Sequence, residues 1–239
     1  MKNQALFLNF FMAILLFSSC KKEDSLPDEP TISKGCEIDF LRLNSEFTSK
    51  LNFLVDDAKK LNYETGYLLY HSKTNGFNYQ KIEGNPEEAS IVFAPKGQID
   101  GLIHSHYGNL YPNFSGSDIK AIYEAYYYEK MNDYQKFIAV VASGYDTSYL
   151  LKISDLNKFL TFSNKYLIEK NSFVAFETKY HTIQKAGQTA HGINQSFENA
   201  LLQILSTSGL TLYKSIAPFH HWIRLEWKEN NTTNSTSCW

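Results

Sequence analysis

The stretch GLIHSH, residues 101–106, decides how the rest of this chain is interpreted. Its first half is small or apolar, as in a buried strand, and its second half places His104 and His106 two positions apart. Side chains at positions i and i+2 of a strand point to the same face, so the two imidazoles project together. Neutral imidazole is a common zinc ligand, and a catalytic zinc site needs a third protein ligand and a fourth place for water. The pair is therefore a candidate for part of a zinc site at the end of a buried strand, with two unrelated surface or core histidines as the alternative that this spacing alone leaves open.

The carboxylate of Asp118 is the candidate for the third ligand. It lies in SGSD, residues 115–118, at the start of an apolar stripe with helical spacing. The loop after His106 could fold back and direct this carboxylate at the same metal ion. A second interpretation also fits, because Ser-X-X-Asp ahead of a helix approximates a capping box, in which Ser115 accepts a backbone hydrogen bond and the helix dipole favours Asp118. The spacing alone leaves a helix cap and a metal ligand both open.

Apolar periodicity on either side of GLIHSH predicts an alternation of helices and strands. Apolar residues recur every three or four positions over residues 40–61, which is typical of an amphipathic helix, and again over residues 117–130. Short β-rich runs bounded by turn residues predict strands at residues 66–70, 77–82, 90–94, 101–103, 137–142 and 149–153. This order predicts an α/β fold in which helices flank a layered sheet.

The chain beyond the last of these strands carries a different pattern. Residues 193–204 show a helical apolar stripe, and apolar runs follow at residues 210–216 and 222–227. We therefore expect a mostly helical C-terminal extension, residues 156–229, that packs on the core. Residues 230–239 are polar and rich in Asn, Thr and Ser, so we expect them to form a loose tail.

The first residues resemble the leader of an exported lipoprotein. An apolar run behind Lys2 ends in Ser-Ser-Cys, which predicts a signal peptide over residues 1–19 that is too short to span a membrane. The small residues ahead of Cys20 resemble a bacterial lipobox, so Cys20 is expected to be lipidated, with an incidental cysteine behind an ordinary secretory signal as the alternative. Residues 20–36 would form the lipid anchor and tether. We expect a protein of the cell envelope, attached to the outer membrane by its lipid, with its exposure on the cell surface left open.

Charge and cysteine content narrow the classes of function. The 239 residues carry a formal net charge of −2 and no basic block, so nucleic acid is not an expected partner. With Cys20 assigned to lipid, Cys36 and Cys238 are the remaining thiols. In an oxidising compartment they could form a disulfide that joins the two ends of the folded part, although two unpaired thiols fit the sequence equally well.

Taken in order along the chain, these features resemble the motif of the JAMM, or MPN-plus, metallopeptidases. The shared features are a glutamate that opens a strand after the first helix, a strand that ends in His-Ser-His, and Ser-X-X-Asp at the start of a helix. The resemblance covers about residues 39–153 and implies a JAMM-like, cytidine-deaminase-like core over residues 37–155. The motif positions correspond to Glu64, His104, His106, Ser115 and Asp118.

The resemblance implies a role for each motif residue. His104, His106 and Asp118 would hold one zinc ion, and Glu64 would act as the general base that activates a water molecule. Ser115 would stabilise the negative charge of the tetrahedral intermediate.

Position alone does not single out the general base. Glu83, Glu87 and Glu88 also lie between the first expected helix and the histidines. Of these glutamates, only Glu64 opens a strand directly after that helix, as the motif requires.

The loop after the second histidine departs from the family pattern. Residues 107–114 form a segment one residue longer than usual, and Tyr107 stands where the family often has proline. In the family this loop borders the substrate groove. Tyr107, Tyr111 and Phe114 are therefore candidates for substrate contact, with simple packing of the loop as the alternative. The altered loop means that the substrate of this chain cannot be copied from the family.

The function expected from the resemblance is zinc-dependent hydrolysis of a peptide or isopeptide bond in a peptide or protein substrate. The alternative is a catalytically silent, MPN-like binding module or scaffold at the surface, which holds a peptide or a partner protein. Such modules typically lose a histidine or the aspartate, whereas His104, His106 and Asp118 are all present here. The intact set of ligands favours the hydrolase.

Overall fold

The computed structural model describes residues 36–72, 76–86, 88–108, 110–228 and 232–238. The expected signal peptide, Cys20 and nearly all of the expected tether lie outside these ranges, as do residues 230, 231 and 239 of the expected tail. Within the described ranges, no helix combines the length and the apolar character that a membrane crossing requires.

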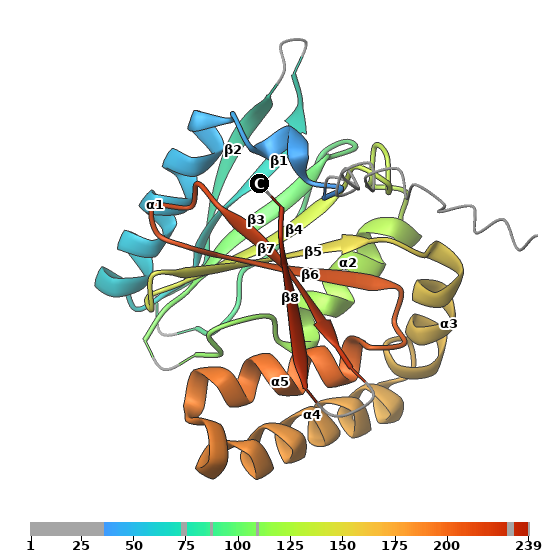
Figure 1. Cartoon of the computed structure of the whole chain (residues 1–239). Helices are drawn as coiled ribbons and strands as arrows, with labels where there is room; N and C mark the ends of the chain where they lie inside the picture. Colours follow the sequence, from blue (N-terminus) through green and yellow to red (C-terminus); the bar gives the residue numbers. More distant parts are fainter. Residues whose placement is uncertain (1–35, 73–75, 87, 109, 229–231, 239) are drawn as a thin grey trace, which may run out of the picture. The chain divides into compact units, whose positions relative to one another are not determined.

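In the described ranges, eight strands form one mixed sheet with the order β2-β1-β3-β4-β5-β6-β7-β8 (Figure 1). Neighbouring strands are antiparallel except β3 and β4, which are parallel. The strands are β1 (Thr65–His71), β2 (Phe77–Glu83), β3 (Gly101–His106), β4 (Ile138–Ser143), β5 (Thr147–Ile153), β6 (Leu210–Ile216), β7 (Trp222–Trp227) and β8 (Thr233–Ser237). The strand that carries the two histidines therefore lies inside the sheet, between β1 and β4.

Helix α2 (Gly116–Tyr127) joins the parallel strands β3 and β4. A parallel connection has to bring the chain back to the opposite end of the sheet, so the helix runs back along the sheet from the edge where β3 ends. The start of α2 is thus brought to the edge at which β3 presents His106.

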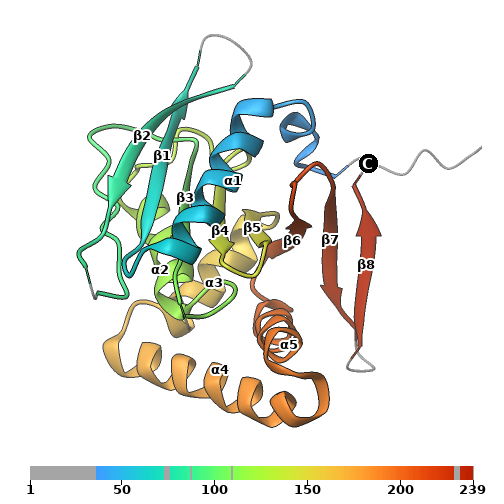
Figure 2. The ribbon, with the colours of Figure 1, turned by 90° about the vertical axis from the view of Figure 1, so that its left-hand side faces the viewer.

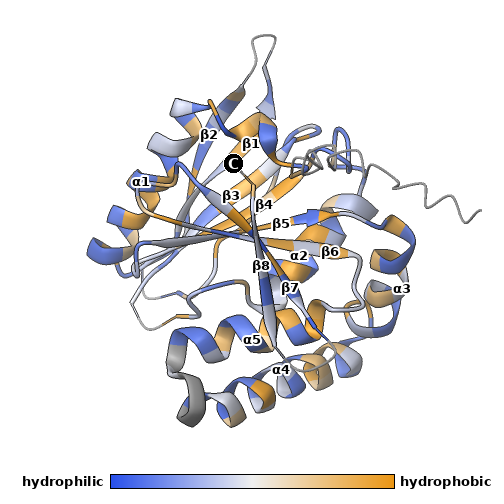
Figure 3. Cartoon of the chain, viewed as in Figure 1, coloured by the Kyte–Doolittle hydropathy of each residue, from blue (hydrophilic) through white to orange (hydrophobic). Residues whose placement is uncertain are grey.

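Helices cover both faces of the sheet. Helix α1 (Ser45–Lys60) packs on one face, whereas α2, α3 (Leu156–Tyr166) and α5 (Ile193–Leu205) pack on the other. Helix α4 (Lys170–His191) lies against α5, α3 and α2, and Figure 2 shows it outside α5. Successive strand residues alternate between the two cores, and Figure 3 shows hydrophobic residues concentrated in the central strands.

The predicted α/β fold, a sheet flanked by helices, is confirmed. One predicted strand, residues 90–94, is wrong, because this segment forms no strand. Its residues do alternate between partly buried and exposed positions, as in a strand. However, β1 is paired on both sides, by β2 and β3, and β3 is paired by β1 and β4. Among the described strands of this half of the sheet, only β2, at the end of the strand order, leaves an edge free, and the segment does not pair with it.

The expected loose tail is also wrong for the part that the structure describes. Residues Thr233–Ser237 form β8, which pairs with β7 along its whole length. This edge strand is exposed or half-exposed at every position, so its sequence lacks the apolar alternation that would identify a strand. The C-terminal extension, residues 156–229, thus continues the sheet with β6 and β7 in addition to supplying three helices, and the tail adds β8.

A disulfide joins Cys36 to Cys238 and connects two ends of the described chain that are 202 residues apart in sequence. In the unfolded chain this bond would hold a very large loop closed, which lowers the entropy of the unfolded state. We expect Cys238→Ser to lower the free energy of unfolding by about 2–4 kcal/mol in urea denaturation under oxidising conditions. Adding dithiothreitol should bring the wild type to the level of the variant. Equal denaturation midpoints under oxidising conditions would contradict this prediction.

Candidate metal centre

The two histidines lie together at the end of β3, as the spacing predicts. His104 is completely buried and His106 is 5% exposed, and their Nε2 atoms lie 3.0 Å apart. Gly66 of β1 is the partner of His104 in the sheet, and a Cβ atom at Gly66 would lie 2.4 Å from the carbonyl oxygen of Ile103. Glycine at this position therefore allows β1 to pack closely against the strand that carries the histidines.

Asp118 directs its carboxylate at both histidines from the first turn of α2. Its Oδ1 lies 3.1 Å from His104 Nε2, and its Oδ2 lies 3.4 Å from His106 Nε2. The capping box is also present, since the Ser115 backbone N–H and hydroxyl each donate to Asp118 Oδ2 at 2.7 Å and Asp118 N–H donates to Ser115 Oγ at 3.2 Å. The helix cap is therefore present, and it fixes the same carboxylate that faces the two histidines.

Glu64 approaches the same point from the residue before β1. It is 5% exposed, and its Oε1 lies 3.8 Å from His106 Nε2. The start of β1 is held beside β3 by a hydrogen bond of 3.0 Å from Thr65 N–H to Ser105 Oγ. Glu64, His104 and His106 each offer a ligand atom within 4.8 Å of the others, a group that could hold a metal ion.

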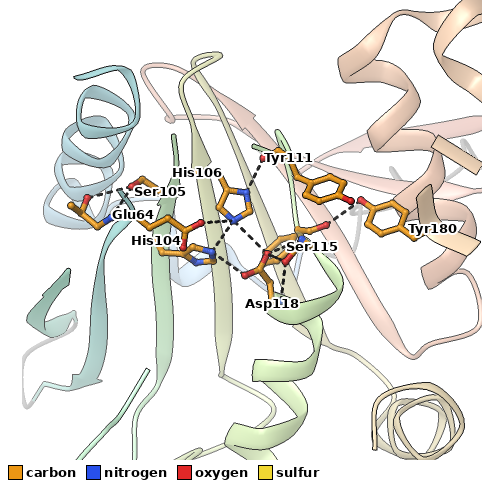
Figure 4. A network of polar contacts seen from close by, with 10 residues as sticks. Glu64, His104, Ser105, His106, Tyr111, Ser115, Asp118 and Tyr180 are labelled. Atoms are coloured by element: carbon orange, nitrogen blue, oxygen red, sulfur yellow. Dashed lines mark hydrogen bonds and ion pairs between the residues drawn. The ribbon is translucent and has the colours of Figure 1, made fainter. Parts of the chain in front are cut away.

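The rival glutamates do not reach this point. Glu83 is exposed and pairs with Lys81, and Glu88 is exposed and accepts a hydrogen bond from Asn85. Glu87 lies outside the described residues. Among the described glutamates between α1 and β3, Glu64 is therefore the one that faces the histidines (Figure 4).

The second nitrogen of His106 defines how this imidazole faces the site. His106 Nδ1 lies 2.7 Å from the carbonyl oxygen of Tyr111, which can only accept a hydrogen bond. Nδ1 therefore carries a hydrogen, and in the neutral ring Nε2 presents a lone pair to the site, as a metal-binding histidine does. Figure 4 shows this arrangement, with the Tyr111 ring directed away from the histidines.

The charges of the four side chains are strongly coupled without a metal ion. Burial raises the pKa of Glu64. Burial alone would lower the pKa of His106, but the carboxylates of Asp118 and Glu64 raise it to about 9. Burial would likewise raise the pKa of Asp118, but the two imidazoles hold it well below its usual range. The side chains of Glu64, 6% exposed, and Asp118, 12% exposed, thus favour a positive charge at the point where the two imidazoles meet.

The candidate substrate residues occupy different environments. Phe114 is completely buried in the core, and Tyr111 packs its ring against Tyr180 of α4 and Phe197 of α5. Tyr107 is half-buried at the start of the loop. Packing therefore accounts for Phe114 and for the ring of Tyr111.

No protein-family model matches this chain, and no match was found among curated proteins or solved structures. The fold and the site by themselves define an α/β protein with a mixed sheet and a buried Glu64–His104–His106 group that could hold a metal ion.

The contribution of Tyr180 could not be identified from the sequence. Its spacing from Phe173 and Phe176 marks it as part of the apolar stripe of a helix, and Tyr180 and Phe176 are indeed buried. This spacing indicates which face of α4 is buried, but not what that face contacts. In the structure the buried face meets the loop that contains Asn113 and Phe114, and this contact depends on tertiary structure alone.

The capping box predicts a measurable link between helix stability and metal binding. We expect Ser115→Ala to cost about 1 kcal/mol of stability, because a cap is lost. The same change removes one of the two hydrogen bonds that hold Asp118 Oδ2 and leaves only the one from the Ser115 backbone N–H, so zinc affinity should fall by about tenfold. Asn44→Ala is the matched control. Asn44 caps the N-terminal end of α1 by accepting a hydrogen bond of 2.9 Å from Phe47 N–H, whereas Glu64 follows the C-terminal end of that helix. Chemical denaturation and zinc titration of both variants check this. An equal loss of zinc affinity in both would show that general destabilisation, and not the held carboxylate, is responsible.

Proposed function

We propose that this protein is a zinc-dependent hydrolase that cleaves a peptide or isopeptide bond in a peptide or protein substrate. The observation that carries the proposal is the convergence of His104 and His106 with two carboxylates in a buried place. Imidazole nitrogens and carboxylate oxygens are the protein ligands of those catalytic zinc sites that contain no cysteine. Buried acceptors and negative charges that face one another are costly unless a cation lies between them.

We assign His104, His106 and Asp118 as the ligands of the metal ion. The distances of 3.1 Å and 3.4 Å from Asp118 to the two Nε2 atoms are shorter than the 3.8 Å from Glu64 to His106 Nε2. Asp118 is also fixed by the capping box, and a ligand needs such support to keep its geometry. Glu64 also satisfies the distances of a ligand, so it is the rival for the third position.

Glu64 then acts as the general base in this proposal. A bound zinc ion supplies Lewis acidity, which lowers the pKa of water at the site. Glu64 takes the proton of the attacking water and delivers it to the leaving nitrogen of the amide. Burial, which raises the pKa of Glu64, suits a carboxylate that must both accept and return a proton.

Ser115 has a double role in this proposal. Its hydroxyl donates to Asp118 Oδ2 in the structure, so it first holds the ligand in place. Rotation of this hydroxyl away from Asp118 would provide a hydrogen-bond donor for the oxygen of the tetrahedral intermediate.

A second candidate function is a binding module whose metal ion is structural. The low exposure of the site favours it, since His104 is fully buried and Glu64 and His106 are each 5% exposed. Such a protein would hold a peptide or partner without cleaving it. The intact ligand set and the buried Glu64 favour the hydrolase over this candidate.

The proposed location is the cell envelope, with the protein attached to the outer membrane through lipidated Cys20. The disulfide between Cys36 and Cys238 supports export, because such bonds persist in oxidising compartments and are rare in the cytosol. The lipid would connect the protein to the membrane, and the substrate would be met outside the cytosol.

The proposed function is tested with protein that lacks residues 1–20, loaded with zinc and mixed separately with a peptide library, isopeptide-linked conjugates and peptidoglycan. Mass spectrometry of the products should detect a new amine and a new carboxyl end at one kind of amide bond. Glu64→Gln is the matched inactive variant. Cleavage of none of these substrates by zinc-loaded protein would favour the binding module.

A further inference from the structure

A side chain of helix α4, in the C-terminal extension, contacts the loop that connects His106 to Asp118. Tyr180 lies on the buried face of α4 and is 1% exposed. Its hydroxyl lies 2.9 Å from Asn113 Oδ1 and 3.1 Å from the carbonyl oxygen of Phe114, and these two acceptors share its one hydrogen. Asn113 Nδ2 has no partner among the described residues, so in that part of the chain Tyr180 is the anchor of the buried Asn113 side chain. One hydroxyl therefore fixes the loop immediately before Ser115.

The same helix also holds Tyr111, which lies earlier in the loop. The Tyr111 ring stacks on Tyr180 with 5.8 Å between ring centroids and 13° between planes. It meets Phe197 of α5 edge-on at 4.8 Å, and its hydroxyl contacts His181 of α4. Three side chains from two helices therefore surround the ring of Tyr111.

The residues that α4 holds are linked directly to the two parts of the metal centre, His106 and Asp118. The backbone carbonyl of Tyr111 accepts the hydrogen bond from His106 Nδ1 at 2.7 Å. On the other side, Phe114 precedes Ser115, whose hydroxyl and N–H hold Asp118. Because the ring and the carbonyl belong to one residue, holding the ring of Tyr111 limits where its carbonyl can point. Tyr180 therefore contacts the two places in the loop from which His106 and Asp118 are held (Figure 4).

We propose that Tyr180 is a positioning residue of the metal centre, and that α4 is thereby an integral part of the site and not an appended segment. Tyr180 does not touch the metal ligands and acts through the loop that orients them. This inference rests on the proposed metal site. Groups that orient a metal ligand without touching the metal typically contribute a factor of about 10 to 100 to metal affinity. Removing the Tyr180 hydroxyl leaves two buried acceptors without their donor, so the loop should rearrange and both ligands should become less well placed.

The test compares wild type, Tyr180→Phe and Tyr149→Phe as full folded proteins. Zinc affinity is measured by competition with a chromophoric chelator, and the visible absorption of the cobalt(II)-loaded proteins reports the geometry of the ligands. Tyr149→Phe is the matched control, because Tyr149 is 2% exposed and donates at 2.9 Å to Glu198 of α5, a link between the extension and the sheet that does not involve the loop. We expect Tyr180→Phe to bind zinc about tenfold more weakly and to show an altered cobalt spectrum. Tyr149→Phe should match wild type in both measurements.

The outcomes separate this inference from the proposed function. Wild type that binds zinc tightly, with Tyr180→Phe equal to it in affinity and cobalt spectrum, would overturn the role of Tyr180 and leave the metal site intact. An equal loss in Tyr149→Phe would also overturn it, because the extension would then act only by general packing. Wild type that binds no zinc would overturn both proposals.

If Tyr180→Phe does not fold, Tyr111→Leu decides instead, since it keeps the carbonyl that faces His106 but removes the ring held by α4. It should weaken zinc binding to a similar degree, and wild-type affinity in this variant would overturn the inference.

Discussion

We expect His106→Ala to lose nearly all of the zinc that the wild-type protein holds, about one ion per chain. The variant removes one of two imidazoles that meet at a distance of 3.0 Å between their Nε2 atoms. Two remaining protein ligands are too few for a tetrahedral zinc site that keeps a place for water. Elemental analysis after dialysis against zinc-free buffer measures the metal content directly.

His71→Ala is the matched control for this prediction. His71 ends β1 at the opposite end of the strand from Glu64, and its side chain is 75% exposed. Its removal should leave the zinc content unchanged. Undiminished zinc in His106→Ala, with wild-type protein that does hold zinc, would mean that the ion binds elsewhere on the chain.

The second large effect is expected for Glu64→Gln, which should keep zinc and lose turnover by a factor of about 100 to 10,000. Glutamine has nearly the shape of glutamate but cannot accept a proton from water. Because Asp118 and not Glu64 is the proposed third ligand, the metal should stay in place. The comparison requires a substrate identified in the cleavage experiment, and both zinc content and kcat are measured.

Glu83→Gln serves as the control for Glu64→Gln, since Glu83 was a rival base and its side chain is 50% exposed beside Lys81. Its kcat should equal that of wild type. Loss of zinc from Glu64→Gln as complete as in His106→Ala would exchange the roles of Glu64 and Asp118. Full activity in Glu64→Gln would remove Glu64 from the chemistry altogether.

Much of the fold could be predicted because its elements carry strong periodicity. The amphipathic stripe of α1 and the apolar runs of β3 and β4 lie on buried faces, so the burial requirement is visible in the sequence. Residues 90–94 have the composition of a strand but pair with no strand of the sheet, whereas β8 pairs with β7 although its sequence is polar. In both segments strand pairing depends on the tertiary surroundings of the segment, which local sequence does not encode.

Part of the candidate site could likewise be predicted from local sequence, and part depends on tertiary structure. Local spacing explains why His104 and His106 lie on one face, and the Ser-X-X-Asp pattern explains the cap that fixes Asp118. The contacts of Tyr180 with a loop 66 and 67 residues earlier in the chain have no counterpart in local spacing. They arise because α4 packs against α2, the helix that directly follows this loop.

The most direct test of the central claim is a crystal of the zinc-loaded protein measured at the zinc absorption edge. We predict an anomalous difference peak between the side chains of His104, His106 and Asp118, at about 2.0–2.1 Å from the two Nε2 atoms. A peak at another place on the chain, or the absence of a peak among these residues in zinc-loaded crystals, would contradict the account.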